Sequence, residues 1–258
     1  MNLSVAIVCK NSERTIARTL ESVAGLADEI VAVDSGSTDR TIAILEQHDA
    51  RVLRSEWLGF GPTKQIANDA CQGDWVLALD SDESVLPELA ESVREAISSE
   101  SGRMGYDLNR KVYYRGQPLN HIWQPERIVR LTRRDAFRWG GLEPHAYLQP
   151  VGPEALIGHL RGDLRHDSIE DGFVGFLAKQ VGYAETMAAS MHASGKRSSA
   201  SKLITRPAAA MLKQLILKRG YRDGRAGWLA AASMAAATLM KYTVLLELDE
   251  KRTKDPER

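Results

Sequence analysis

The stretch EIVAVDSGSTDRTIAIL, residues 29–45, contains the unit from which the fold of this chain is built. Residues 29–34 are almost continuously apolar and are predicted to form a buried strand. The turn residues SGSTD follow at 35–39, and Ile42 and Leu45 then have the spacing of one face of a helix. A strand followed by a helix of this kind is the repeating element of proteins with a parallel sheet.

The same alternation continues through the first hundred residues. Further strands are predicted at residues 3–9, 51–54 and 74–80. Apolar residues at helical spacing mark the helices between and after them: Ile16, Leu20 and Val23; Ile66 and Ala70; and Leu89, Val93 and Ile97 after Pro87. Because such apolar strands are buried on both faces, we predict an α/β fold with a mainly parallel central sheet flanked by helices.

The alternation stops after the first hundred residues. Segments between residues 105 and 160 are predicted to be antiparallel or mixed strands with long connections. Ser168, with Asp171 three residues later, resembles a capping box, so a helix is expected to begin there. We therefore predict that residues 1–100 and 101–194 are the two halves of one α/β domain.

The last part of the chain, residues 195–258, is predicted to be a helical extension. A flexible linker at 195–202 precedes a helix that Pro207 opens and a final helix over residues 227–248. The uncharged run 226–240 has fifteen residues. A spanning helix needs about 20 strongly apolar residues, so a buried or interfacial helix is expected.

Charge is unevenly distributed, although the chain has 34 basic and 34 acidic residues and no net charge. Residues 196–225 contain nine Lys and Arg against one acid, Asp223, so this segment carries +8 and the rest of the chain −8. Contact with an anionic partner and a solvated helical face both account for this excess. No RNA- or DNA-binding motif accompanies it, so nucleic acid is not expected.

Other classes of protein are excluded by missing motifs. Cys9 and Cys71 have neither CxxC spacing nor the even-numbered framework of a disulfide scaffold, so a reducing compartment is expected. The turn after the first strand, CKNSER at residues 9–14, contains no glycine. A Rossmann dehydrogenase would require G-x-G-x-x-G there.

Polar residues follow three of the predicted strands. Lys10 and Asn11 come after the first strand, Asp34 ends the second, and Asp80 and Asp82 end the fourth. Ligands of open α/β sheets bind at the carboxyl ends of the strands, so these side chains are expected to converge on one crevice.

The residues Asp80, Ser81, Asp82 and Glu83 place several carboxyl groups at the end of a buried strand. Their charges repel one another unless a cation neutralises them. Oxygen ligands suit Mg²⁺ or Mn²⁺, which keep waters and take further oxygens from substrate phosphates. The alternative is a polar turn before the helix at Pro87.

Three stretches carry a resemblance to a known family: LSVAIVCKNSERTIARTLESV at 3–23, EIVAVDSGSTDRT at 29–41 and GDWVLALDSDE at 73–83. They resemble the nucleotide-sugar domain of family 2 glycosyltransferases, which have the GT-A fold. The later stretches RIVRLTRRDAFRWGGLEPHAYL, LRGDLRHDSIED and LKRGYRDGRAGWLAAA resemble the lipopolysaccharide-core branch of the β-1,4-glucosyltransferase type.

The resemblance implies roles for individual residues. Asp34 would contact the uracil or ribose of a UDP-sugar, Lys64 would approach the diphosphate, and Asp82 would bind the metal directly. The implied donor-binding residues are Val8, Lys10, Asn11, Asp34, Lys64 and Asp80. His166 would close the site as a metal or phosphate contact, and the alternative is a hydrogen bond at the entry to the next helix.

The sequence departs from the family pattern where the catalytic base is expected. Relatives in this branch have a His followed by an acid, whereas here Ala146 follows His145 and the nearest carboxylate is Glu143. Glu143 is therefore the predicted base, and His145 is predicted to act as a base or as a second metal contact. Arg127 and Arg130 would steer an anionic acceptor or the diphosphate, unless they form the solvent face of a strand.

The resemblance implies an inverting, metal-dependent glycosyltransferase that moves a hexose, glucose, from a UDP-sugar to a lipopolysaccharide inner-core acceptor. The implied cofactor is Mg²⁺ or Mn²⁺. The expected location is cytoplasmic, with residues 196–248 in peripheral contact with the inner face of the bacterial inner membrane. A polyprenyl-phosphate or other glycan acceptor and a catalytically idle module that binds nucleotide-sugar or glycan are the alternatives.

Overall fold

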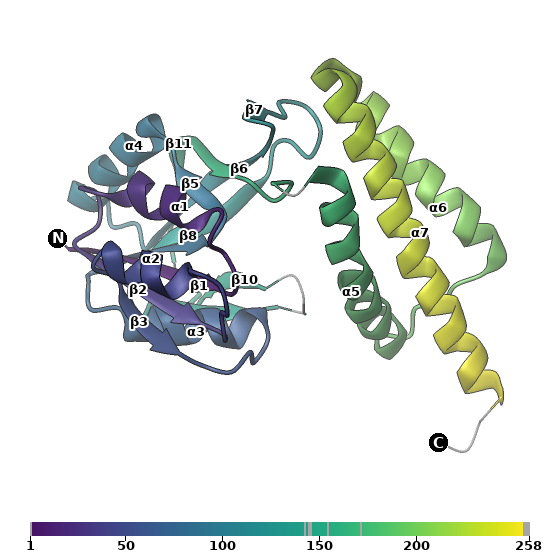
Figure 1. Cartoon of the computed structure of the whole chain (residues 1–258), viewed down its shortest axis with the longest axis horizontal. Helices are drawn as coiled ribbons and strands as arrows, with labels where there is room; N and C mark the ends of the chain where they lie inside the picture. The colour runs from purple at the N-terminus through teal and green to yellow at the C-terminus, as the bar shows by residue number, and fades with distance from the viewer. Residues whose placement is uncertain (1, 142, 144–145, 154, 171, 255–258) are drawn as a thin grey trace. The chain divides into compact units, whose positions relative to one another are not determined.

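The computed structural model of the chain describes residues 2–141, 143, 146–153, 155–170 and 172–254. The chain divides into two compact units, which are described separately (Figure 1). Unit 1 consists of Met1–Lys111, Pro125–Gly141 and His145–Asp167, and unit 2 of Val112–Gln124, Leu142–Pro144 and Ser168–Arg258. The predicted division into a nucleotide-sugar-binding half at residues 1–100, an acceptor-side half at 101–194 and a basic amphipathic helical extension at 195–258 stays a prediction.

Unit 1 contains the predicted parallel strands. They are β1 (Leu3–Cys9), β2 (Glu29–Asp34), β3 (Arg51–Arg54) and β4 (Trp75–Asp80), in the order β3-β2-β1-β4. β1 pairs in parallel with both β2 and β4, so Val8 lies opposite Val33 on one side and Asp80 on the other. This register brings the carboxyl ends of the three strands to one edge of the sheet, as the sequence predicted.

Beyond β4 the sheet becomes antiparallel. Its remaining strands are β8 (Arg127–Arg133), β6 (Gly105–Tyr114), β11 (Ile157–His166) and β5 (Glu83–Val85), in that order, with β7 (Gln117–Pro118) beside β6. β8 pairs antiparallel with β4 and β6, and β9 (Phe137–Gly140) and β10 (Tyr147–Pro150) form a separate hairpin. The prediction of an α/β sheet with later antiparallel strands is confirmed.

Helices cover both faces of the parallel strands, which explains why these strands are apolar throughout. The helices of unit 1 are α1 (Ile16–Val23), α2 (Thr41–Gln47), α3 (Phe60–Ala70) and α4 (Pro87–Ser98). Leu3, Val5 and Ile7 of β1 are fully buried in one cluster with side chains of α1, α2 and α4. Ala6, with the opposite orientation, packs in a second cluster with Ala67 of α3.

Unit 2 contains three long helices, α5 (Gly172–Ala193), α6 (Ala200–Leu212) and α7 (Gly224–Lys254). A π-helical turn at Lys213–Leu217 and a 3₁₀ turn at Gly220–Asp223 connect α6 to α7. Figure 1 shows α7 running alongside both α5 and α6, and these two pairs are in contact.

Three predictions about this helical region need correction. Pro207 does not open a helix but lies inside α6, which begins at Ala200 and so also shortens the predicted linker. Proline removes one helical hydrogen bond, and packing of α6 against α7 compensates for this loss. α5 begins at Gly172 rather than Ser168, and the predicted capping partner Asp171 lies outside the described residues.

The final helix is longer than the predicted range 227–248. Within the described residues, the helical segment Gly220–Lys251 is long and apolar enough to cross a membrane, by length and composition, with a mean hydropathy of 1.5 in its most apolar window. Only 22% of that window is buried inside the protein. The expectation of a buried or interfacial position stays a prediction.

Asp223 fastens the turn before α7 to the segment at residues 120–122. Its carboxylate accepts hydrogen bonds from the backbone N–H groups of Asn120 (3.0 Å), His121 (3.0 Å) and Ile122 (2.8 Å). It also lies 2.9 Å from Nδ1 of His121. Burial raises the pKa of Asp223, but the hydrogen bonds from Ile122 and His121 outweigh this effect and lower the pKa below its ordinary value.

Asp223→Ala is expected to lower the free energy of unfolding of the protein by about 1–3 kcal/mol at neutral pH, because three backbone donors lose their acceptor. A carboxyl whose folded pKa is lowered stabilises above its unfolded pKa, about 3.9, and this contribution disappears as pH falls through the folded pKa. Urea titrations at several pH values should therefore show the difference between wild type and variant shrinking below about pH 4. A difference that is constant with pH would contradict this assignment.

Candidate functional site

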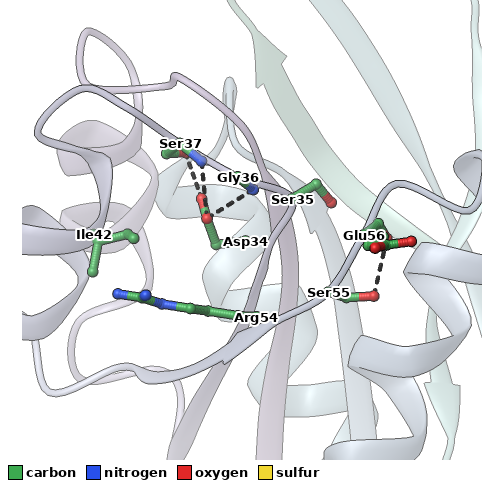
Figure 2. A pocket seen from close by; sticks show the side chains of 8 residues that line it. All are labelled: Asp34, Ser35, Gly36, Ser37, Ile42, Arg54, Ser55 and Glu56. Atoms are coloured by element: carbon green, nitrogen blue, oxygen red, sulfur yellow. Dashed lines mark hydrogen bonds between the residues drawn. The ribbon is translucent and has the colours of Figure 1, made fainter.

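The turn after β2 forms one side of a hollow of about 480 Å³. Oδ2 of Asp34 accepts hydrogen bonds of 3.0 Å from both Gly36 N and Ser37 N, and the Ser37 hydroxyl donates to Oδ1. Figure 2 shows this turn with Arg54 extending beneath Asp34 toward Ile42. The residues lining the hollow are Asp34, Ser35, Gly36, Ser37, Ile42, Arg54, Ser55 and Glu56.

These hydrogen bonds show that Asp34 stabilises the turn after β2. Its side chain is buried, and Gly36 of the turn has φ of 90°, a conformation that favours glycine. The Cys9 thiol also donates to Oδ1 at 3.8 Å, but a thiol is a weak donor, so this oxygen retains capacity for a ligand hydroxyl or N–H group. Asp34 therefore has the position and the chemistry for the predicted nucleoside contact.

The residues after β1 hold the same turn from the other side. Asn11 has φ of 50°, its Oδ1 accepts a hydrogen bond of 2.8 Å from Thr38 N, and its own N–H donates to Ser37 Oγ at 2.9 Å. Lys10 is exposed, and Val8 is partly buried beside Asp80 in the sheet. Asn11 thus fixes the turn that carries Asp34, and direct donor contacts of Val8, Lys10 and Asn11 stay predictions.

Asp80, at the end of β4, is surrounded by cations of the protein itself. Lys64 Nζ lies 2.5 Å from Oδ1, while Arg130 Nη2 and Arg110 Nη1 lie 3.0 Å and 3.8 Å from Oδ2. Burial raises the pKa of Asp80, but Lys64 and Arg130 outweigh it and hold the pKa well below its usual range. Asp80 is therefore ionised at physiological pH, and the positive charges of Lys64 and Arg130 balance its negative charge.

Glu83 belongs to the same ion network, although the sequence indicated no role for it. It is fully buried, and its Oε1 accepts hydrogen bonds from Arg130 Nη2 (3.1 Å) and Arg110 Nη1 (3.2 Å). Its Oε2 accepts the backbone N–H of Asp80 at 2.9 Å. The repulsion among these carboxyl groups is thus relieved by side chains of the chain, and no bound metal is needed for it.

Arg110 and Arg130 also belong to the ion network. Arg130 is 4% exposed, so the possibility that it lies on the solvent face of a strand is wrong. Arg110 also contacts Glu126 at 2.6 Å. Burial lowers the pKa of Arg110, but Glu126 and Glu83 raise it above its ordinary value. Arg127 instead pairs with Asp107 near the surface.

Trp139 of β9 supports two of these cations. Lys64 Nζ lies 4.8 Å and Arg130 Cζ 5.6 Å from the centroid of the Trp139 ring. The indole N–H donates to Asn68 Oδ1 at 3.2 Å, which fixes the orientation of the ring. Burial lowers the pKa of Lys64, and Asp80 opposes this shift. Cation–π contacts of this kind stabilise cations that have lost water.

Asp82 faces a different neighbour. His166, at the end of β11, has Nε2 3.5 Å from Asp82 Oδ1, and the backbone N–H of Asp167 donates to the Asp82 carbonyl at 2.9 Å. Burial lowers the pKa of His166, but the charge of Asp82 outweighs it and raises the pKa. Between Asp80 and Asp82, Ser81 is held by a 2.8 Å hydrogen bond with Ser12 Oγ.

The Asp82–His166 pair fits a divalent cation that takes most of its ligands from elsewhere. Within the described residues, no group of three or more His, Cys, Asp or Glu side chains is arranged to hold a metal. In addition, Nδ1 of His166 is buried and has no hydrogen-bond partner in the described part of the chain. The Asp82 carboxylate suits Mg²⁺ or Mn²⁺ when substrate phosphates and waters supply most of the other ligands, and the His166 imidazole would add one nitrogen ligand in its neutral form.

The two predicted catalytic residues, Glu143 and His145, are not among the residues described at this site. Glu143 lies in a turn of unit 2 and is partly exposed, and it has interactions of its own there. His145 lies outside the described residues. Their catalytic roles stay predictions.

Comparison with known proteins identifies the class to which this fold and site belong. The family model Glycosyl transferase family 2 matches residues 4–144, more than half of the chain. The chain therefore belongs to the family 2 glycosyltransferases, and the predicted GT-A type of α/β sheet agrees with this membership.

Individual relatives match the chain over nearly its whole length. The lipopolysaccharide core biosynthesis glycosyltransferase LpsC of Rhizobium meliloti is 30% identical over 90% of this chain and 87% of its own length. An uncharacterized glycosyltransferase of Rickettsia typhi is 27% identical over 96% of this chain and 88% of its own. Glucosyl-3-phosphoglycerate synthase from Mycobacterium tuberculosis, crystallised with Mn²⁺ and UDP, shows a partial likeness, with 25% identity, a TM-score of 0.38 and coverage of 42% of this chain and 44% of that one.

Proposed function

We propose that this glycosyltransferase transfers a hexose, glucose, from a UDP-sugar to an inner-core acceptor of lipopolysaccharide. The observation that carries the proposal is the loop after β4, in which Asp80 is neutralised by Lys64 and Arg130 while Asp82 faces His166. The acceptor class rests on the similarity to LpsC, which spans nearly the whole chain.

The donor is proposed to lie along the carboxyl edge of the parallel strands. Its nucleoside would enter the hollow beside Asp34, where the carboxylate is available to accept from a base N–H or a ribose hydroxyl. Its diphosphate would extend toward Lys64 and the loop of Asp80 and Asp82. Lys64 would then divide its charge between Asp80 and a phosphate oxygen, as a compact ammonium with three donors can do.

Asp82 and His166 are the residues proposed to hold Mg²⁺ or Mn²⁺. When bound, such an ion supplies positive charge that stabilises the departing UDP. The ion network is formed in the protein without any ligand. In it, Lys64, Arg110 and Arg130 keep Asp80 ionised and bind the start of the loop after β4.

An inverting transfer requires a base that takes the proton from the acceptor hydroxyl as the new bond forms on the face opposite the leaving group. Glu143 is proposed for this step, with His145 as the alternative. Residues 196–248 are proposed to keep the enzyme in peripheral contact with the cytoplasmic face of the inner membrane, where a lipid-anchored acceptor would be presented.

The direct test is to incubate the protein with a panel of UDP-sugars and measure the release of UDP. We expect measurable turnover of UDP-glucose with Mg²⁺ or Mn²⁺, and loss of this turnover when EDTA is added. Release that persists in EDTA would contradict the metal assignment. If no donor is turned over with either metal, the idle binding module is correct instead.

The acceptor is tested separately in a deletion strain. Accumulation of a truncated core oligosaccharide supports the proposed acceptor. A normal core together with a missing lipid-linked sugar would instead identify a polyprenyl phosphate as the acceptor.

A further inference from the structure

The connection between α6 and α7 presents large apolar side chains to solvent. We call residues 212–229 the tip; it comprises the last residue of α6, the π-helical turn, the 3₁₀ turn and the first residues of α7. Ile216, Leu217, Tyr221 and Trp228 of the tip are 61%, 77%, 51% and 55% exposed, and Leu212 and Leu229 are exposed as well. Such a concentration of apolar side chains within eighteen consecutive residues marks an interaction surface.

Basic side chains are interleaved with these apolar ones. Lys213, Arg219, Arg222 and Arg225 are all exposed. Across the described ranges of the chain, none of the four has a carboxylate within ion-pair distance. The one acid of the tip is Asp223, whose side chain is 4% exposed and accepts hydrogen bonds from the backbone of residues 120–122. The outward charge of the tip is therefore entirely positive.

The tip is joined to residues 123 and 124 of unit 2 by hydrogen bonds, and the core beneath it is already filled. Gln214 Oε1 accepts the backbone N–H of Trp123 at 3.2 Å, and Lys218 Nζ donates to the Gln124 carbonyl at 2.8 Å. Gly227 lies so close to Gly220 that an added Cβ would meet the Gly220 carbonyl oxygen at 1.8 Å. Leu215, which points inward, is already buried in the core of unit 2.

We propose that the tip is an interfacial anchor that binds the surface of an anionic lipid bilayer. Trp228 and Tyr221 are the side chain types favoured at the level of the headgroups, and Ile216 and Leu217 would enter the acyl boundary. The four basic residues would contact lipid phosphates. This inference rests on the membrane contact of the proposed function and narrows it from residues 196–248 to the tip.

The contacts of α7 within unit 2 argue against its crossing the membrane. This helix is packed along both α5 and α6, and its far end is bound to the connection between them. Asp249 accepts the backbone N–H of Ser198 at 2.7 Å, and Ser198 Oγ donates to the Tyr242 carbonyl at 2.9 Å. Insertion of α7 alone would break these contacts, whereas docking of the tip leaves them intact.

The test is cosedimentation of the full-length protein with vesicles of phosphatidylcholine alone and with vesicles that contain phosphatidylglycerol. We expect binding to the anionic vesicles, weak binding to the neutral ones, and release at high salt. A variant with Arg219, Arg222 and Arg225 changed to Gln should bind the anionic vesicles on the order of 100-fold more weakly. The double variant Ile216→Glu, Leu217→Glu should also lose binding, while Val181→Glu, an exposed apolar position on α5, should not.

UDP release from UDP-glucose in solution is measured for every variant, because the tip contains none of the residues proposed to bind the donor. Unchanged release with lost vesicle binding supports the anchor. Equal binding of the Ile216, Leu217 variant and wild type to anionic vesicles would overturn it, as would failure of the wild type to bind them. Protein that leaves the vesicles only with detergent would overturn it in favour of an inserted α7. Absence of UDP release with normal vesicle binding would contradict the donor assignment alone.

Discussion

Asp82→Ala is expected to reduce the rate of sugar transfer on the order of 1,000-fold, with little effect on folding. The carboxylate of Asp82 is proposed to hold the cation that stabilises departing UDP, and a loss of about 4 kcal/mol of this stabilisation corresponds to that factor. The partner of Asp82 is His166, which is partly buried and has Nε2 3.5 Å from Asp82 Oδ1. Because an imidazole can be neutral, the variant leaves no obligatory buried charge, and the protein should still fold. Initial rates with UDP-glucose over a range of Mg²⁺ and Mn²⁺ concentrations provide the measurement.

The matched control is Asp74→Ala. Asp74 lies just before β4, whereas Asp82 lies just after it. Asp74 is exposed and accepts a 3.1 Å hydrogen bond from Asn2 N at the opposite edge of the sheet. Its removal should leave the transfer rate within about twofold of wild type, as for surface substitutions away from the chemistry. An Asp82→Ala protein that is as active as wild type would remove Asp82 from the metal site.

The largest stability effect is expected for Glu83→Ala. Removal of one partner from a buried ion network typically costs about 3–5 kcal/mol, and here Lys64, Arg110 and Arg130 would be left with only Asp80 and Glu126, so one positive charge loses its compensation. Glu83 is fully buried and contacts both Arg110 and Arg130, and it also accepts the backbone N–H of Asp80. We expect a decrease of that size in the free energy of unfolding, measured by urea denaturation followed by circular dichroism.

Glu95→Ala is the control for this change, since Glu95 and Arg161 form a pair in which both side chains are more than half exposed. Exposed pairs contribute about 0–1 kcal/mol, so this variant should unfold nearly as wild type does. Glu83→Gln retains an acceptor of the same volume and should fall between the two, which keeps the test usable where the alanine variant does not fold. Equal stability of all three variants would contradict a structural role for the network.

Much of the fold could be predicted because it depends on local pattern. The strands at 3–9, 29–34 and 51–54 and the helices between them appear where apolar spacing placed them. Parallel strands necessarily share one carboxyl edge, so the gathering of Asp34, Asp80 and Asp82 on that edge also followed from the order of the elements. Family membership strengthens this interpretation, because the same stretches carry the resemblance.

The helical unit was predicted less well because its packing outweighs local preference. Pro207 has a strong tendency to begin a helix, yet it lies in the interior of α6, which packs against α7. The sequence indicated a basic segment with Tyr221, Trp228 and leucines as the membrane contact, but not which apolar side chains are exposed together. Only the turns between α6 and α7 place Ile216, Leu217, Tyr221 and Trp228 outside the core that buries Leu215.

By itself, the sequence determined the α/β class, the family and the strand ends that carry the acidic residues, because these depend on periodicity and spacing within short segments. The tertiary structure alone decided how the acidic charges are neutralised. Lys64, Arg110 and Arg130 come from α3, β6 and β8, and the antiparallel pairing of β8 with β4 and β6 brings the two arginines beside Glu83. Interaction between charges depends on their distance in space, and no spacing along the chain records that distance.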